Sequence, residues 1–371
     1  MTAEDRVKAV AEFGFTERQS RFLVTVMLHS GVCLLRQYTA FAGIVDGQKT
    51  RKFFHKLVSC RYATAYPCRH NRGSVYHVHH KPLYRAIGET DSRHRRPMPA
   101  ARVVDALTLL DAVLASPELV WLAAEEEKQV HLSSLAGIGA DKLPHLTVGD
   151  GVAKAVRLFP DKVPIGIDLS GRWVVVYLLT NDRRDDFYWF LHRHAALFSA
   201  LPAWTLRIVF PPPFDRLEER YRDDFRYALG TRSSNRANLV KDLRWYFKQR
   251  RAHELEGTPI QDEESYYEFK ECLRATHFQV LYRRWLTEGE GAFDVVSSQA
   301  AADAIERGSG RVECHVLPFS YRHLSPLVGV ARPRSKGAEK GEDTPTRPRP
   351  PFECSTVTVS ASAEHVNHAA I

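Results

Sequence analysis

One segment near residue 50 constrains the fold more than any other, because its apolar and basic residues separate at helical spacing. With about 100° per residue, four apolar side chains share one face of a helix over residues 48–60: Phe53, Phe54, Leu57 and Val58. Three lysines lie on nearly the opposite face: Lys49, Lys52 and Lys56. Such a helix can pack on a core and offer its other side to a polyanion. The alternative is a solvated basic face on a structural helix.

The flanking residues predict the element order of a winged helix-turn-helix. The capping box that begins at Thr16 starts a helix with apolar positions at helical spacing. The elements around residues 48–60 are expected at residues 16–30 (helix), 32–35 (strand), 37–43 (helix), 62–66 and 74–78 (strands). The loop of the hairpin contains Arg69 and Arg72, which can reach backbone phosphate or the minor groove. A winged domain used only for protein contacts is the alternative.

The basic excess of the chain lies in this N-terminal part. Residues 1–97 contain 17 Lys/Arg and 7 Asp/Glu, and the remaining residues contain 35 and 37. Such a concentration of charge indicates a phosphate-binding module, and double-stranded DNA is the expected partner. The residues expected to hold phosphates are Lys49, Lys52, Lys56, Arg69 and Arg72. Those expected to contact base edges are Gln48, Thr50, Arg51 and His55.

The rest of the chain predicts a multidomain protein of mixed α+β and α/β class. Residues 1–90 would be the winged helix-turn-helix domain and residues 91–100, polar and bounded by proline, a linker. Residues 101–213 alternate helical and strand patterns in an α/β order. Residues 214–330 are expected to be mainly helical, and residues 331–371, rich in Pro, Gly, Lys and Arg, a disordered tail.

The order of elements over residues 101–213 resembles the αβββαβ core of restriction-endonuclease-like nucleases. In those enzymes a Pro-Asp pair precedes a hairpin whose second strand carries an acid and a lysine. Pro160-Asp161 and Asp168 are present, but the strand at residues 173–180 has neither Glu nor Lys. A magnesium site needs converging carboxylates, so we expect an inactive nuclease-like scaffold. A magnesium-dependent nuclease or nickase that uses Asp161 and Asp168 is the alternative.

The arrangement over residues 14–211 is similar to that of proteins from bacterial plasmids and integrative elements, including the replication-relaxation family. The segments that carry the resemblance are residues 47–62, 75–77, 159–162 and 192–194. The resemblance implies a DNA-binding protein of a mobile genetic element that acts in replication, transfer or transcription control. A protein-interaction adaptor is a further alternative.

The sequence also bears on membrane association, cellular compartment and metal binding. No apolar stretch is long enough for a membrane span, and residues 1–15 lack the apolar centre of a signal peptide, so a cytoplasmic protein without membrane contact is expected. Its six cysteines are scattered. Neither CxxC nor HxxxH spacing occurs among the cysteines and histidines near the hairpin, so no metal site and no cofactor is predicted. A homodimer is possible.

Overall fold

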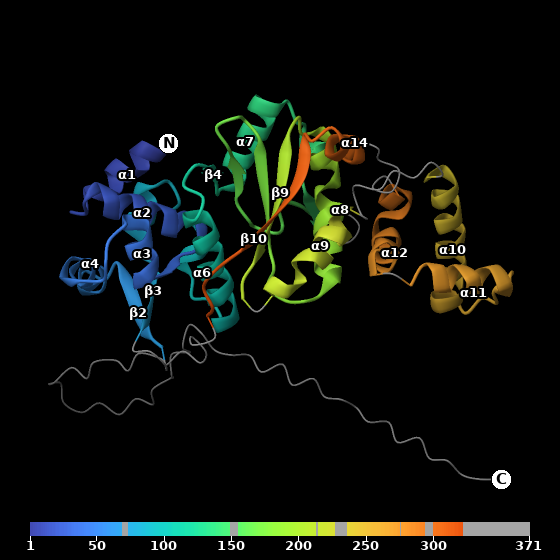
Figure 1. The fold of residues 1–371 in the computed structure, drawn as a ribbon, viewed down its shortest axis with the longest axis horizontal. Helices are drawn as coiled ribbons and strands as arrows, with labels where there is room; N and C mark the ends of the chain where they lie inside the picture. Colours follow the sequence, from blue (N-terminus) through green and yellow to red (C-terminus); the bar gives the residue numbers. More distant parts are fainter. Residues whose placement is uncertain are drawn as a thin grey trace, which may run out of the picture. The chain divides into compact units, whose positions relative to one another are not determined.

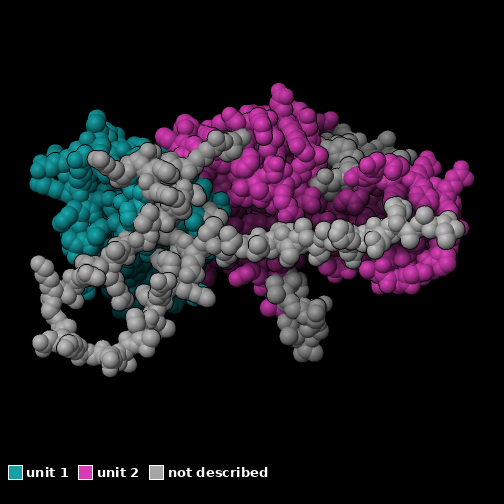
Figure 2. All heavy atoms as spheres, turned by 90° about the horizontal axis from the view of Figure 1, so that it is seen from below, with its two compact units in different colours: residues 1–107, 321–371 teal, residues 108–320 magenta. Residues whose placement is uncertain are grey.

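The computed structural model describes residues 1–68, 73–148, 155–212, 214–226, 236–274, 276–293 and 300–321. The chain forms two compact units (Figure 2). Among the described residues, unit 1 comprises Met1–Leu107 with Tyr321, and unit 2 comprises Thr108–Ser320. The boundary falls inside helix α6 (Ala100–Leu114). The predicted tail, residues 331–371, lies outside the described residues.

Besides the first half of α6, the described residues of unit 1 form five short helices, a 3-10 turn and three strands; Figure 1 shows them in blue to teal. They are α1 (Ala3–Ala11), α2 (Glu17–His29), β1 (Val32–Leu34), α3 (Leu35–Ala42), α4 (Gln48–Ser59), β2 (Ala63–Pro67), β3 (Ser74–Val78), α5 (Lys81–Ala86) and η1 (Arg93–Arg95). The predicted helix at residues 16–30 is confirmed, and Thr16 and Gln19 form its capping box. The sequence prediction omitted α1, which begins with a second capping box between Thr2 and Asp5.

The strands of unit 1 form one antiparallel sheet in the order β1-β3-β2. Its core combines fully buried residues of α2, such as Phe22 and Met27, with Val32 of β1 and Val75 of β3. Buried Val103 and Leu107 from the first half of α6 belong to a cluster with Val32 and Val75. This packing explains why unit 1 extends past residue 100.

Residues 91–100 belong to unit 1, although the sequence suggested a linker. The ring nitrogen Nε2 of His77 lies 2.9 Å from the carbonyl oxygen of His94, which joins β3 to η1. Gly31 has φ of 72°, and a Cβ there would lie 2.4 Å from the same carbonyl oxygen. The polar composition of this segment concealed a close backbone approach that only glycine permits.

Unit 2 is built on a five-stranded sheet in the order β10-β9-β8-β7-β4. Its strands are β4 (Val120–Leu122), β7 (Ile165–Ile167), β8 (Trp173–Leu178), β9 (Trp204–Phe210) and β10 (Gly310–Val316). β4, β7 and β8 are mutually antiparallel, whereas β8, β9 and β10 are parallel. β6 (Ala155–Leu158) pairs with β5 (His145–Val148) as a separate antiparallel hairpin.

Helices cover both faces of this sheet. α8 (Arg184–Ala200) packs with Trp204, Leu206 and Ile208 on one face, and the end of α6 packs with Val176 and Val209 on the other. The alternation of side chains along β9 produces these two faces. The remaining helices of unit 2 are α7 (Glu125–Ala136), α9 (Glu218–Phe225), α10 (Arg236–Glu256), α11 (Glu263–Cys272), α12 (Thr276–Glu288) and α14 (Ala300–Glu306), with 3-10 turns at Ala140–Lys142, Asp215–Leu217 and Gly289–Phe293.

The region after residue 213 is mainly helical, as expected, but it also supplies β10 to the sheet. α10, α11 and α12 share a separate aromatic core that includes Phe247, Tyr266 and Trp285. Within the described residues, no helix combines the length and the apolar composition needed to cross a bilayer.

Candidate nucleic-acid interface

Helix α4 is fixed to unit 1 by aromatic side chains. Phe53 and Phe54 are each 2% exposed, and Leu57 is fully buried. The ring centroid of Phe53 lies 4.6 Å from that of Tyr38 of α3, and Phe54 lies 4.3 Å from Tyr76 of β3. Because α4 is anchored to another helix and to the sheet, the direction of its outer face is set by the core of unit 1.

The outer face of α4 carries an uninterrupted set of polar and basic side chains. Its exposed predicted residues are Gln48, Lys49, Arg51, Lys52 and His55. The first turn of the helix contains no acid. One carboxylate lies close by, because Arg51 and Asp46 form an exposed ion pair at 3.6 Å. This face is therefore cationic and open, as binding to a polyanion requires.

One predicted base-contacting residue of α4, and one predicted core residue, are placed differently from the prediction. Thr50 is 1% exposed and cannot touch a base edge. It precedes Phe53, Phe54 and Leu57 by three, four and seven positions, which puts all four side chains on the buried face. Val58, predicted to be buried, is 40% exposed because it lies at the margin of that face.

Lys56 is also engaged within the protein. Its ammonium donates a hydrogen bond to the carbonyl oxygen of Gly14 and lies 4.5 Å from the ring centroid of Phe15. This pairing ties α4 to the connection between α1 and α2. We therefore remove Lys56 from the phosphate-contacting set and assign it to positioning α4.

The hairpin that follows α4 has the predicted strands, β2 and β3, in antiparallel register. Arg69 and Arg72, predicted at its tip, lie outside the described residues.

The sequence prediction left out two exposed arginines near the ends of α4. Arg18, in the first turn of α2, lines a cavity of about 660 Å³ together with Lys49 and Tyr38. Arg61 directly follows the C-cap of α4 and is exposed. Arg61 lies beyond the end of the α4 periodicity, and Arg18 is brought near Lys49 by the tertiary arrangement.

The histidines His77 and His79 of the hairpin region make contacts within the protein. Burial lowers the pKa of His77 to about 4 and that of His94 to about 3. Nε2 of His79 lies 2.9 Å from the Thr64 hydroxyl. No three His, Cys, Asp or Glu side chains converge to hold a metal ion anywhere in the part of the chain that the structure describes.

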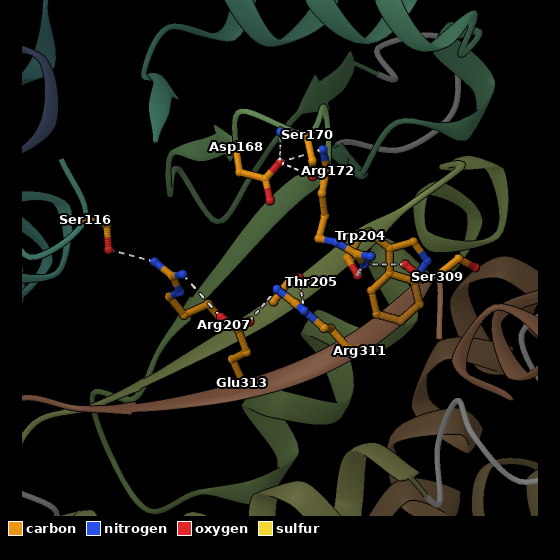
Figure 3. Close-up of polar contacts among 10 residues, drawn as sticks. All are labelled: Ser116, Asp168, Ser170, Arg172, Trp204, Thr205, Arg207, Ser309, Arg311 and Glu313. Carbon is orange, nitrogen blue, oxygen red and sulfur yellow. Dashed lines mark hydrogen bonds and ion pairs between the residues drawn. The ribbon is translucent and has the colours of Figure 1, made fainter. Parts of the chain in front are cut away.

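The two carboxylates considered for a nuclease site lie at opposite ends of β7. Asp161, before the strand, accepts two hydrogen bonds from the guanidinium of Arg193 of α8, one of them 3.2 Å long. Asp168, after the strand, accepts hydrogen bonds from the backbone nitrogens of Ser170 at 2.8 Å and Arg172 at 3.0 Å (Figure 3). The structure does not bring Asp161 and Asp168 together at one metal position.

Arginines on one face of the unit 2 sheet join β10 to β9. Arg207 donates to the Ser116 hydroxyl at 2.7 Å and to Glu313 at 3.2 Å (Figure 3). Glu313 also pairs with Arg311 at 2.9 Å. Because one carboxylate lies between two guanidinium groups of neighbouring parallel strands, this cluster stabilises the edge of the sheet, and we assign it no ligand.

The exposed polar and basic residues of α4 therefore form the candidate nucleic-acid interface of unit 1. Comparison of the chain with known protein families, with curated proteins and with solved structures finds no match.

Proposed function

We propose that unit 1 is a winged helix-turn-helix domain that binds double-stranded DNA and that α4 is its recognition helix. The observation that carries this proposal is the polarity of α4, whose aromatic side is anchored in the core while its basic side is exposed. The order α2-β1-α3-α4-β2-β3 and the sheet order β1-β3-β2 are those of a winged helix.

In this proposal the outer face of α4 enters the major groove, which is about 12 Å wide and admits one helix. Lys49 and Lys52 contact phosphates, and Gln48, Arg51 and His55 contact base edges. An arginine or a glutamine that makes two hydrogen bonds to one base contributes about 1–3 kcal/mol of discrimination. Arg18 is exposed and, although its guanidinium also donates to the Ala42 carbonyl at 3.3 Å, adds a contact to the DNA backbone from α2.

For unit 2 we propose a nuclease-like scaffold without a metal site, which mediates assembly. The order α6-β4-β7-β8-α8-β9, with α7, β5 and β6 inserted between β4 and β7, is compatible with an αβββαβ core. Asp161 is engaged by Arg193, and β8 carries no carboxylate, so the described residues of this core do not supply converging carboxylates for magnesium. Control of replication, transfer or transcription of a mobile element, as the resemblance implies, is the setting we propose.

The test combines selection of duplexes from random DNA with fluorescence anisotropy over a series of salt concentrations. Lys52→Ala should weaken binding to all duplexes alike and reduce the salt slope by about one unit. Arg51→Ala should relax the preference at one base pair. Lys8→Ala, an exposed lysine on α1, is the matched control and should bind as the wild type does. Unchanged affinity and slope in both α4 variants would refute the assignment.

A further inference from the structure

Arg61 has a backbone conformation that arginine rarely adopts. Its φ is 58°, in the left-handed region. The Arg61 amide donates to the Val58 carbonyl at 3.0 Å, and the Tyr62 amide donates to the Leu57 carbonyl at 2.8 Å. These two hydrogen bonds form a Schellman motif that ends α4, and the left-handed position of this motif is usually glycine.

The fold itself gives no reason for an arginine at this position. A side chain with a Cβ is strained in the left-handed region, whereas glycine adopts it freely. The neighbouring Tyr62 supplies the packing, since its ring contacts those of Phe13 and Phe15. The Arg61 side chain is exposed, and within the described part of the chain its guanidinium has no hydrogen bond or ion pair.

We propose that Arg61 is a phosphate-contacting residue of the interface and that its charge is retained at a cost in stability. The proposal rests on the proposed function of α4. Arg61 connects the end of α4 to β2, the first strand of the hairpin, so its position is between the two elements expected at the DNA. A guanidinium there, with no internal carboxylate to neutralise it, can bind one phosphate.

The alternative is that Arg61 stabilises the end of α4, because a cation near a helix C-terminus interacts favourably with the helix dipole. The two explanations predict opposite effects of Arg61→Gly on stability. Relief of strain raises the melting temperature of unit 1, and loss of a dipole contact lowers it. The sign of this change therefore separates a binding residue from a capping residue.

The experiment compares the full chain with Arg61→Gly, Arg61→Lys and Lys162→Gly. Lys162 is a matched control, because it is a basic residue in the same backbone region (φ of 56°) but in unit 2. Binding is measured by anisotropy on the selected duplex over a series of salt concentrations. The melting of unit 1 is followed through hydrogen peroxide oxidation of Met27, which is fully buried in α2.

We expect Arg61→Gly to raise the melting temperature of unit 1 by about 4 °C, since relief of about 1 kcal/mol of strain has this effect in a domain of such size. The same variant should lose about 0.9 units of salt slope and bind about eightfold more weakly at 0.1 M salt. Arg61→Lys should keep most of the affinity, and Lys162→Gly all of it.

Two results would overturn the proposal while leaving the function of α4 intact. One is wild-type affinity and slope in Arg61→Gly, and the other is a lowered melting temperature in that variant. If the wild-type chain itself fails to bind duplex DNA at low salt, both the function of α4 and the role of Arg61 are wrong.

Discussion

Acid should weaken unit 1 through His77, because this histidine is buried as a neutral group. His77 lies on β3, is 2% exposed and contacts the His94 carbonyl oxygen. Burial lowers its pKa to about 4, and the nearby His79 has its pKa lowered by burial as well. Other titratable groups around this site are His94 of η1 and His29 at the end of α2.

The direction in which pH changes the stability follows from comparing the pKa of His77 in the folded and unfolded chains. In the unfolded chain the pKa of His77 returns to about 6.5, so the unfolded state binds the proton more tightly. The contribution of neutral His77 to the free energy of unfolding is therefore fully present above pH 6.5, and it is lost as the pH falls from 6.5 toward 4. A pKa of about 4 in the fold gives a loss of about 2 kcal/mol in the free energy of unfolding at pH 5.

Urea unfolding read through Met27 oxidation isolates this effect. All six tryptophans lie in unit 2, so their fluorescence reports the other unit. With an m value of about 1–2 kcal/mol/M, the urea midpoint of unit 1 should fall by about 1–2 M between pH 8 and pH 5 on account of His77. His77→Gln should show an acid shift smaller by this amount. His55→Gln, which removes an exposed imidazole, should retain the wild-type shift. An equal acid shift in His77→Gln and wild type would refute the reasoning.

Three further predictions concern the core, the interface and the sheet of unit 2. Phe53→Ala should lower the free energy of unfolding of unit 1 by about 3–5 kcal/mol, because Phe53 is 2% exposed and packs on Tyr38, and a loss below about 1 kcal/mol in urea unfolding would contradict the packing. Lys56→Ala should leave the salt slope of DNA binding unchanged, because the Lys56 ammonium is bound to Gly14, whereas a slope reduced as in Lys52→Ala would return Lys56 to the interface. Plasmid DNA incubated with the pure protein and Mg²⁺ or Mn²⁺ should stay intact, and nicking that disappears in Asp161→Ala would establish a nuclease.

The periodicity of α4 was sufficient to predict its position and most of its two faces. Phe53, Phe54 and Leu57 are buried as expected, since the helical spacing is a local property. Thr50 belongs to the same face, but its hydroxyl side chain concealed this when only apolar residues were counted. For Thr50, the register on the helix therefore predicted burial better than polarity did, whereas Val58, at the margin of the same face, is 40% exposed.

Features that depend on distant parts of the chain could not be read from the sequence. β10 lies about a hundred residues after its parallel partner β9 in the chain, and no local sequence pattern indicates this pairing. The hydrogen bond from Lys56 to the Gly14 carbonyl and the contact of His94 with His77 likewise depend on the tertiary structure. The left-handed conformation of Arg61 was concealed because glycine is the residue that normally marks such a helix end.

The two units differ in how many of their cations the protein neutralises, and this difference is a reason to propose the interface on unit 1. In unit 2, where acids and bases are nearly balanced, Arg184, Arg193 and Arg207 each pair with a carboxylate. Residues 1–97 have ten more bases than acids, so carboxylates cannot pair with them all. Arg21 and Arg51 have carboxylate partners, but the exposed bases on and beside α4 outnumber the acids near them. An external polyanion that replaces the missing carboxylates would release its condensed counterions on binding. The salt slope of DNA binding would therefore report how many of these cations contact phosphates.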